Sequence, residues 1–411
     1  MTTLLHRPLL EELLTAHPPE KMLFLAGPRQ AGKTFIAKKA LEQNGGFGLY
    51  LNWDIPKDRK TILAHHKNDI LSDLRKPGQL PLVVFDEIHK MNKFKGWLKG
   101  FYDQNKDDAK IWVTGSGRLD LYQKGGDSLL GRYFLYHMHP LTVGELSLSA
   151  GSMYGEDPDA LWQRFENGDA NKTSIEQLLK FGGFPEPFLK QTEKFLRRWH
   201  DSRRSRVTHE DVRDLTRIQD LDKLEYLIEL LNPRISSPFS LNSVREDLEV
   251  NHDTVKNWMK TLQRVYYVYT LKPYSQRIQR SLKKEEKVYY WDWSEVLGEG
   301  ARFENFAVSH FKKACDRWTD FGFGKFQLWY VRDKAKNEVD VLITRDKKPW
   351  LMAEIKLASS ELSPALVKFG RQLKCPRIVQ IVASPGVHRR IKIDDCIVHL
   401  VSAGNLFGFI E

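Results

Sequence analysis

A glycine-rich loop near the start of the chain constrains the fold more than any other feature. An apolar run at 21–26 predicts a buried strand before the loop, and residues 35–41 predict a helix after it. In this strand–loop–helix order the glycines let successive backbone N–H groups point at phosphate oxygens. The loop consists of Gly27, Pro28, Arg29, Gln30, Ala31, Gly32, Lys33 and Thr34.

The residue types at the end of this loop suit a nucleoside triphosphate. A lysine at position 33 can neutralise the β- and γ-phosphates, and the hydroxyl of Thr34 can hold Mg²⁺. A chance match to a degenerate pattern is the alternative, but the flanking strand argues against it. The sequence therefore predicts ATP and Mg²⁺ as cofactors, bound by residues 27–34.

Composition narrows the class of protein. The chain has 411 residues, of which 41% are hydrophobic, and it contains no apolar run long enough to predict a membrane span. It begins without a signal-peptide pattern, and its three scattered cysteines predict neither a disulfide framework nor a zinc cluster. We therefore expect a cytoplasmic, nucleoid-associated protein. The net charge of +11 favours a polyanionic partner such as DNA, although solubility alone would also explain it.

The spacing of apolar runs predicts a multidomain α/β fold. Further strands are expected at 47–52, 81–87, 110–116 and 133–136, alternating with helices, which is typical of a doubly wound parallel sheet. We expect four domains. They are a P-loop ATPase core at 1–145, a helical subdomain at 146–235, a winged-helix-like unit at 236–294 and a further α/β domain at 295–411.

Two acids at the end of the third predicted strand complete a hydrolytic site. Asp86 would hold the Mg²⁺ shell and Glu87 would polarise the attacking water. A strand that ends in two acids is common, so the prediction depends on the upstream loop. At the end of the next strand, Thr114 or Ser116 is placed to sense the γ-phosphate, with an ordinary turn as the alternative.

An arginine before the fifth predicted strand suggests that the site is shared between subunits. Arg132 follows a glycine, and its planar, permanently charged guanidinium could stabilise charge during phosphoryl transfer. A surface arginine after a turn is the alternative. If a neighbour supplies Arg132, the protein is a homo-oligomer, with a hexameric ring as one form.

Several short motifs together resemble a known family. Residues 86–89, 113–117, 130–132 and 139–146 are similar to AAA-type ATPases (AAA_14) that carry a C-terminal DUF4143 region, and 182–186 matches another hallmark of that group. The resemblance covers nearly the whole chain. Gly117 departs from the pattern, because the family often has a second serine there. The resemblance implies an architecture more than a substrate.

The middle of the chain has the rhythm of a winged helix. Residues 239–248 and a helix that starts at 253 predict a helix-turn-helix, and strands at 266–270 and 288–291 would form the wing. Packing against other domains is the alternative to DNA contact. Arginines at 197–198 and 203–206 could add DNA contacts or line a subunit interface. The wing residues expected to contact phosphates are Lys272, Arg277, Arg280, Lys283, Lys284 and Lys287, and those expected to face outward on the second helix are His252, Lys256, Asn257 and Lys260.

The last domain carries a second set of carboxylates. Asp340 lies in one predicted strand, and the next strand ends in Glu354 and Lys356 on the same face. With Glu304 in an upstream helix, this pattern resembles the PD-(D/E)xK nuclease superfamily. Asp340, Glu354 and Glu304 would hold Mg²⁺ together with the carbonyl of Ile355, and Lys356 would activate water. The alternatives are a hairpin with acidic surface positions, or a nuclease fold that only binds.

These sites together predict an ATP-driven enzyme that remodels DNA or translocates on it, at a fork or junction, with a metal-dependent nuclease-like C-terminal domain. One alternative is an ATP-dependent switch in defence or stress, in which the nuclease fold only binds DNA or a partner. Another is a DNA-binding regulator.

Overall fold

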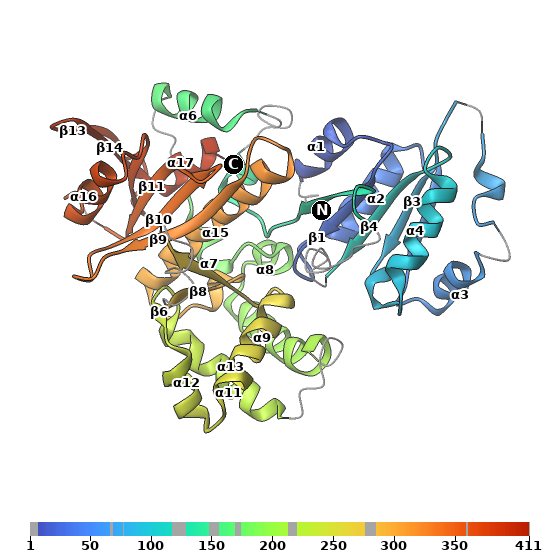
Figure 1. The fold of residues 1–411 in the computed structure, drawn as a ribbon, viewed down its shortest axis with the longest axis horizontal. Helices are drawn as coiled ribbons and strands as arrows, with labels where there is room; N and C mark the ends of the chain where they lie inside the picture. Colours follow the sequence, from blue (N-terminus) through green and yellow to red (C-terminus); the bar gives the residue numbers. More distant parts are fainter. Residues whose placement is uncertain are drawn as a thin grey trace. The chain divides into compact units, whose positions relative to one another are not determined.

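The computed structural model describes residues 7–65, 69–76, 78–116, 129–147, 156–168, 174–212, 220–275, 285–358 and 361–410. The chain divides into two compact units, Met1–His139 with Ala150–Gly155 and Pro140–Ser149 with Glu156–Glu411 (Figure 1). The expected four domains are a finer division, which stays a prediction. None of the helices in the described ranges is both long and apolar enough to cross a membrane.

The first unit is built on a parallel sheet, as predicted. Its described strands pair in the order β2-β3-β4-β1-β5, all parallel. Each strand lies within a few residues of its predicted place. The strands are β1 (Met22–Ala26), β2 (Gly48–Asn52), β3 (Leu82–Asp86), β4 (Lys110–Gly115) and β5 (Tyr133–His137).

An aromatic helix face covers one side of this sheet. Trp97 and Phe101, one turn apart on α4, both meet Phe85 of β3 edge-on, with ring centroids 5.2 and 5.0 Å apart. Burial of these rings against the strands holds the helix in place. The helices of this unit are α1 (Leu9–Ala16), α2 (Lys33–Gln43), α3 (Pro56–Ala64), η1 (Ser72–Leu74), η2 (Ile88–Lys90) and α4 (Phe94–Asn105).

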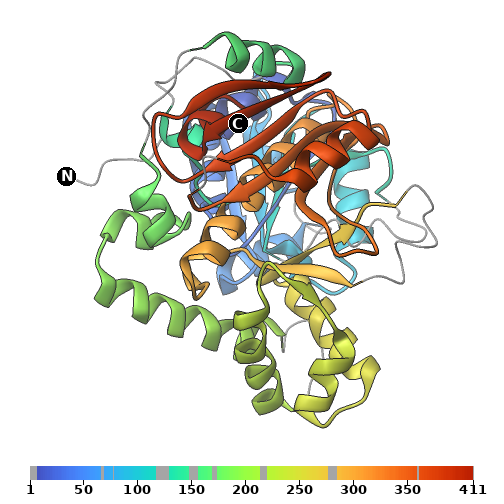
Figure 2. The same ribbon diagram turned by 90° about the vertical axis from the view of Figure 1, so that its left-hand side faces the viewer.

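The second unit is built on a mixed sheet. Its described strands form the order β13-β14-β12-β11-β10-β9-β7-β8-β6. Figure 2 shows the later strands in orange and red. The strands are β6 (Pro238–Phe239), β7 (Val268–Pro273), β8 (Glu286–Tyr290), β9 (Phe326–Arg332), β10 (Glu338–Arg345), β11 (Lys348–Lys356), β12 (Ile378–Val382), β13 (His388–Ile393) and β14 (Cys396–Ser402).

Helices flank this sheet and precede it in the chain. Two of the segments on which the family resemblance is based, 139–146 and 182–186, meet here, because the Leu141 N–H donates to the carbonyl of Gly183 at 2.6 Å. The helices are α5 (Val143–Ser147), α6 (Pro158–Asn167), α7 (Glu176–Phe181), α8 (Pro185–Lys190), α9 (Glu193–Arg206), η4 (Val207–Asp211), α11 (Leu221–Leu231), η5 (Asn232–Arg234), α12 (Leu241–Leu248), α13 (His252–Arg264), η6 (Trp293–Glu295), α15 (Glu299–Asp320), α16 (Pro364–Gln372) and α17 (Ala403–Ile410).

The predicted winged-helix order is present in this unit. Elements β6, α12, α13, β7 and β8 follow one another, and β8 pairs antiparallel with both β6 and β7. Ser240 and Asn251 cap the two helices by accepting hydrogen bonds from the backbone N–H groups of Ser243 and Thr254. The order of elements could therefore be predicted from the sequence, because the capping residues and the helical spacing of apolar residues are local signals.

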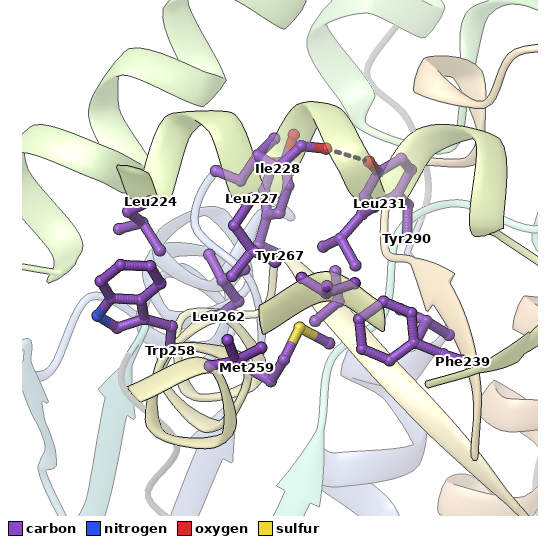
Figure 3. Packing of buried hydrophobic residues seen from close by; sticks show 14 of the residues in the cluster. Leu224, Leu227, Ile228, Leu231, Phe239, Trp258, Met259, Leu262, Tyr267 and Tyr290 are labelled. Atoms are coloured by element: carbon purple, nitrogen blue, oxygen red, sulfur yellow. Dashed lines mark hydrogen bonds between the residues drawn. The ribbon is translucent and has the colours of Figure 1, made fainter. Parts of the chain in front are cut away.

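A compact core joins these helices to the hairpin. In Figure 3, Trp258 and Leu262 of α13 face Leu224 and Leu227 of α11, while the hydroxyl of Tyr290 donates to the carbonyl of Ile228 at 3.2 Å. These apolar side chains pack against one another, so the core excludes water from the facing sides of α11 and α13.

Truncating the largest side chain of this core should destabilise the second unit. Trp258 is 6% exposed, so Trp258→Ala should lower the free energy of unfolding by about 3–5 kcal/mol. The measurement is denaturant unfolding of the whole chain. Tyr226→Ala on α11, where the side chain is 48% exposed, is the matched control and should cost far less. An equal loss in the two variants would contradict the described packing.

The hairpin also continues into the larger sheet, which the sequence did not predict. The end of β7 pairs parallel with β9, placing Lys272 opposite Trp329 and Pro273 opposite Tyr330. The β7–β8 hairpin and the C-terminal strands therefore share one backbone hydrogen-bond network.

Candidate functional site

The phosphate loop links the end of β1 to the start of α2. Gly32 caps α2 with φ 107°, a left-handed conformation that only glycine adopts at low cost. A Cβ at Gly27 would lie 2.3 Å from the carbonyl oxygen of Met138. Both glycines are therefore required by the backbone path itself.

Two cations brace this loop. The ammonium of Lys33 donates to the carbonyls of Gly27 at 2.8 Å and Pro28 at 2.7 Å. The buried guanidinium of Arg7 donates to the carbonyls of Ala31 at 2.9 Å and His139 at 2.7 Å. Arg7 was not predicted, because no motif connects the N-terminal segment with a loop 24 residues later.

The carboxylate of Asp86 is the hub of the adjacent polar cluster. Thr34 Oγ1 donates to Oδ2 at 2.9 Å, Thr114 Oγ1 donates to Oδ1 at 2.5 Å, and the Tyr50 hydroxyl makes a short hydrogen bond to Oδ2. Burial, and then this carboxylate, raise the pKa of Tyr50, which remains a donor. A hydroxyl and a carboxylate side by side fit Mg²⁺, which prefers oxygen ligands.

Glu87 lies beside this cluster in a left-handed conformation, with φ 57°. Its Oε2 accepts a hydrogen bond from Ser116 Oγ at 2.9 Å, and Arg29 Nε donates to that hydroxyl at 3.3 Å. His89 Nε2 lies 3.6 Å from the same carboxylate, and burial lowers the pKa of this histidine. The Ser116 hydroxyl thus orients the Glu87 carboxylate, and the Lys90 ammonium lies 3.9 Å from the same oxygen.

The predicted sensor residues contact the acids. Thr114 donates a hydrogen bond to Asp86 and Ser116 donates one to Glu87, so each hydroxyl orients one of the two acids. Their role in sensing the γ-phosphate stays a prediction. Gly117, at which the family pattern breaks, lies outside the described residues.

In the second unit, the predicted C-terminal residues come together. Glu304 lies on α15, Asp340 on β10, and Glu354 and Lys356 at the end of β11. Lys356 Nζ lies 2.7 Å from Glu354 Oε1. Asp340 Oδ2 accepts a hydrogen bond from the Ile355 N–H at 3.0 Å. Burial raises the pKa of Glu304 and of Glu354, with Asp340 adding to both effects.

A lysine also enters this carboxylate centre. The ammonium of Lys287 lies 3.1 Å from Glu304 Oε1, 3.1 Å from Asp340 Oδ1 and 2.7 Å from Glu338 Oε1. In the part of the chain that the structure describes, no set of three or more His, Cys, Asp or Glu side chains is arranged to hold a metal ion. The metal roles of Glu304, Asp340 and Glu354 stay predictions.

The structure corrects two predicted DNA contacts. Lys287 is 1% exposed, so its assignment to the phosphate-contacting wing is wrong. Arg203 is also buried, in an ion pair with Glu295 at 2.8 Å. Lys272 lies 3.8 Å from Glu286 at the base of the wing. The remaining predicted wing cations, Arg277, Arg280, Lys283 and Lys284, lie outside the described residues.

The outward face of the second winged-helix helix is confirmed. His252, Lys256, Asn257 and Lys260 are all exposed on α13. Arg197 and Arg198 are exposed on α9. These side chains are free of the second unit's core, so solvent reaches them.

Comparison with known families assigns a family to residues 19–147. Residues 19–147 match the family model AAA_14, described as an AAA domain. This range contains the phosphate loop, both acids and their hydroxyl partners. Residues 19–147 form an AAA-type P-loop ATPase domain. Such a domain implies ATP binding, typically with Mg²⁺. Residues 172–295 match a domain of unknown function, DUF8612, and this match differs from the expected DUF4143.

The relatives that match most of the chain are themselves described as uncharacterized. One, from Mycobacterium tuberculosis, is 22% identical over 378 residues, covering 90% of this chain and 77% of the relative. Another, from Methanocaldococcus jannaschii, is 22% identical over 351 residues, covering 80% and 74%.

Two solved structures of other proteins also align. A RuvB variant from Thermotoga maritima is 16% identical with a TM-score of 0.31, covering 67% of this chain and 91% of that one. AMPPCP-bound DnaA from Aquifex aeolicus is 14% identical with a TM-score of 0.30, covering 62% and 86%. TM-scores this low carry no argument about arrangement or function.

The candidate arginine finger lies at the far edge of the AAA-type sheet. Arg132 precedes β5, which runs parallel to β1, so it lies at the amino ends of the strands. The phosphate loop lies at their carboxyl ends, about 16 Å of strand away. The Arg132 guanidinium forms a two-point ion pair with Asp103, at 2.8 and 3.2 Å. From this edge it would act on a neighbouring subunit, and that role, with oligomer formation, stays a prediction.

Proposed function

We propose that this protein hydrolyses ATP in order to remodel DNA or to translocate on it, at a fork or junction. One observation carries the ATPase half of the proposal. Lys33, Thr34, Asp86 and Glu87 gather at the carboxyl edge of one parallel sheet, with hydroxyls already bonded to both acids.

Each of these residues has a distinct task in hydrolysis. Bound Mg²⁺ would supply charge neutralisation at the phosphates, held by Thr34 and Asp86. The ammonium of Lys33 can exchange its two backbone carbonyls for phosphate oxygens. Glu87, kept in place by Ser116, orients and polarises the attacking water.

The DNA half of the proposal is supported by charge and by the winged-helix order. The chain carries a net charge of +11, and α13 presents two lysines and a histidine to solvent. Exposed cations on a helix-turn-helix suit the phosphate backbone, which supplies most of the affinity in nonspecific binding. Remodelling requires such a contact to be coupled to ATP turnover.

The decisive experiment is the ATPase rate of the full chain on a panel of linear, forked and junction DNA. We expect clear stimulation, strongest for one branched structure, and loss of the stimulated rate in Lys33→Ala. Slow turnover that no DNA changes would reject the remodelling proposal and favour the ATP-dependent switch.

Two lysines on α13 provide a direct test of the DNA surface. Lys256→Ala with Lys260→Ala should weaken binding to all sequences about equally and reduce the slope of log affinity against log salt by about 1.8. The measurement is fluorescence anisotropy at several salt concentrations. Lys57→Ala with Lys60→Ala, two exposed positions on α3, is the charge-matched control. If both pairs change the slope equally, α13 is not the contact surface.

For the C-terminal elements we propose a PD-(D/E)xK-like core that binds DNA without cutting it. The order α15, β9, β10, β11, α16, β12 supports the core. The ammonium of Lys287 against Asp340 and Glu304 supports binding over cleavage. Linear, forked and junction DNA should stay intact with Mg²⁺ or Mn²⁺, and cleavage that Asp340→Ala abolishes would reject this part of the proposal.

A further inference from the structure

The carboxylate centre of the second unit contains a cation supplied by a distant part of the chain. Its acids come from α15, β10 and β11, but Lys287 comes from β8, in the hairpin of the winged helix. The Lys287 ammonium contacts three carboxylates, with N–O distances from 2.7 to 3.1 Å. The Lys287 ammonium is thus shared by Glu304, Glu338 and Asp340, and Glu338 also pairs with Arg332 at 3.2 Å.

Because Lys287 is buried, its ammonium must be paired with carboxylates. An isolated ammonium or carboxylate taken out of water is costly, and it persists only when it is paired and hydrogen-bonded. Burial alone would lower the pKa of Lys287, but Glu304, Asp340 and Glu338 outweigh it and raise that pKa. Three carboxylate oxygens within 3.1 Å stabilise the charged ammonium, which performs the electrostatic task that a metal ion would perform in such a cluster.

A fourth carboxylate, that of Glu354, has an oxygen that could bind a further cation. Glu354 is 4% exposed, and its Oε2 is buried without a hydrogen-bond donor among the described residues, while its Oε1 is paired with Lys356. Glu354 also interacts electrostatically with Asp340. Without Lys287, oxygens of Glu304, Asp340 and Glu354 would remain, and they are the hard ligands that Mg²⁺ and Mn²⁺ take.

We propose that the ammonium of Lys287 is the resident cation of a latent divalent-metal site formed by Glu304, Asp340 and Glu354. The native protein accordingly binds no divalent metal there, and removal of the ammonium opens the site. The Lys287 ammonium would occupy this site whether or not the protein binds DNA or hydrolyses ATP.

The first test measures Mn²⁺ binding to the full chain by electron paramagnetic resonance, without nucleotide. We expect Lys287→Met to gain one Mn²⁺ per chain, bound about tenfold or more tightly than by the native protein. Lys287→Arg, which keeps a cation, should resemble the native protein, and adding Asp340→Asn to Lys287→Met should remove the gain. Native Mn²⁺ binding that Asp340→Asn abolishes would overturn the proposal, as would a folded Lys287→Met variant without any gain.

A second measurement needs no substitution at Lys287. Acetic anhydride footprinting of the native protein, read by mass spectrometry, should leave Lys287 unmodified with and without millimolar Mn²⁺, because its ammonium stays buried among the carboxylates. Mn²⁺ entry would have to displace the lysine, so metal-dependent labelling of Lys287 would overturn the proposal even if the variants fail to fold.

Discussion

Replacing Glu87 by glutamine should slow ATP hydrolysis about 100- to 10,000-fold while nucleotide binding persists. The substitution removes the basic carboxylate but keeps the side-chain shape. Ser116 can still donate its hydrogen bond to the amide oxygen, so the local geometry survives. Single-turnover hydrolysis, with binding of a fluorescent ATP analogue measured in parallel, separates the two effects.

Two further variants serve as controls for nucleotide binding and for nonspecific effects of a glutamate-to-glutamine change. Lys33→Ala should abolish nucleotide binding itself, because it removes the phosphate-neutralising ammonium. Glu42→Gln, at an exposed glutamate at the end of α2 that pairs with Lys39, should leave both binding and turnover unchanged. A native rate in Glu87→Gln would show that another group activates the water.

Removing the ammonium of Lys287 should destabilise the second unit in a pH-dependent way. Lys287→Met leaves Glu304, Glu338 and Asp340 without their shared cation, which should cost about 3–5 kcal/mol in the free energy of unfolding at about pH 8. Denaturant unfolding of the whole chain, with hydrogen exchange of β8 and β10 peptides, measures and localises the loss.

The loss should shrink as the pH falls. Burial raises the pKa of Glu304 from 4.5 to about 8 in the folded protein. The Lys287 ammonium lowers this pKa, so its removal should raise the pKa of Glu304 further in the variant than in the native protein. The variant then binds this proton at a higher pH, and the difference in stability between the two proteins shrinks as the pH falls. At about pH 5, Glu304 is protonated and repulsion is relieved. Lys348→Met, at an exposed position on β11, is the control. A loss independent of pH would contradict the charge argument.

The AAA-type site could be predicted because its signals are local. The phosphate loop is contiguous, and Asp86 and Glu87 follow a buried strand whose carboxyl end must meet the loop in a parallel sheet. The partners of these acids were harder to predict. Thr114 and Ser116 were singled out for another role, and Tyr50 on β2 carries no motif at all.

The carboxylate centre shows where sequence reasoning fails. Glu338 could have been found, since it precedes Asp340 by two residues and strand periodicity places both on one face. Lys287 could not, because it lies 53 residues before Asp340 and ends a stretch of five charged residues, 283–287, that indicates a solvated surface. The pairing of β7 with β9 and the hydrogen bonds between Tyr290 and Asn305 of α15 bring its hairpin to the centre.

That strand pairing also determines how the protein can be dissected. A fragment that ends at residue 294, the expected end of the winged helix, would leave β7 with a bare edge in place of β9. Unpaired edges of this kind recruit other strands, so such a fragment should aggregate or dimerise. The complementary fragment would lose the ammonium that balances its acids. The segment from β6 to β8 is an integral part of the second unit, and cutting it away should damage both fragments.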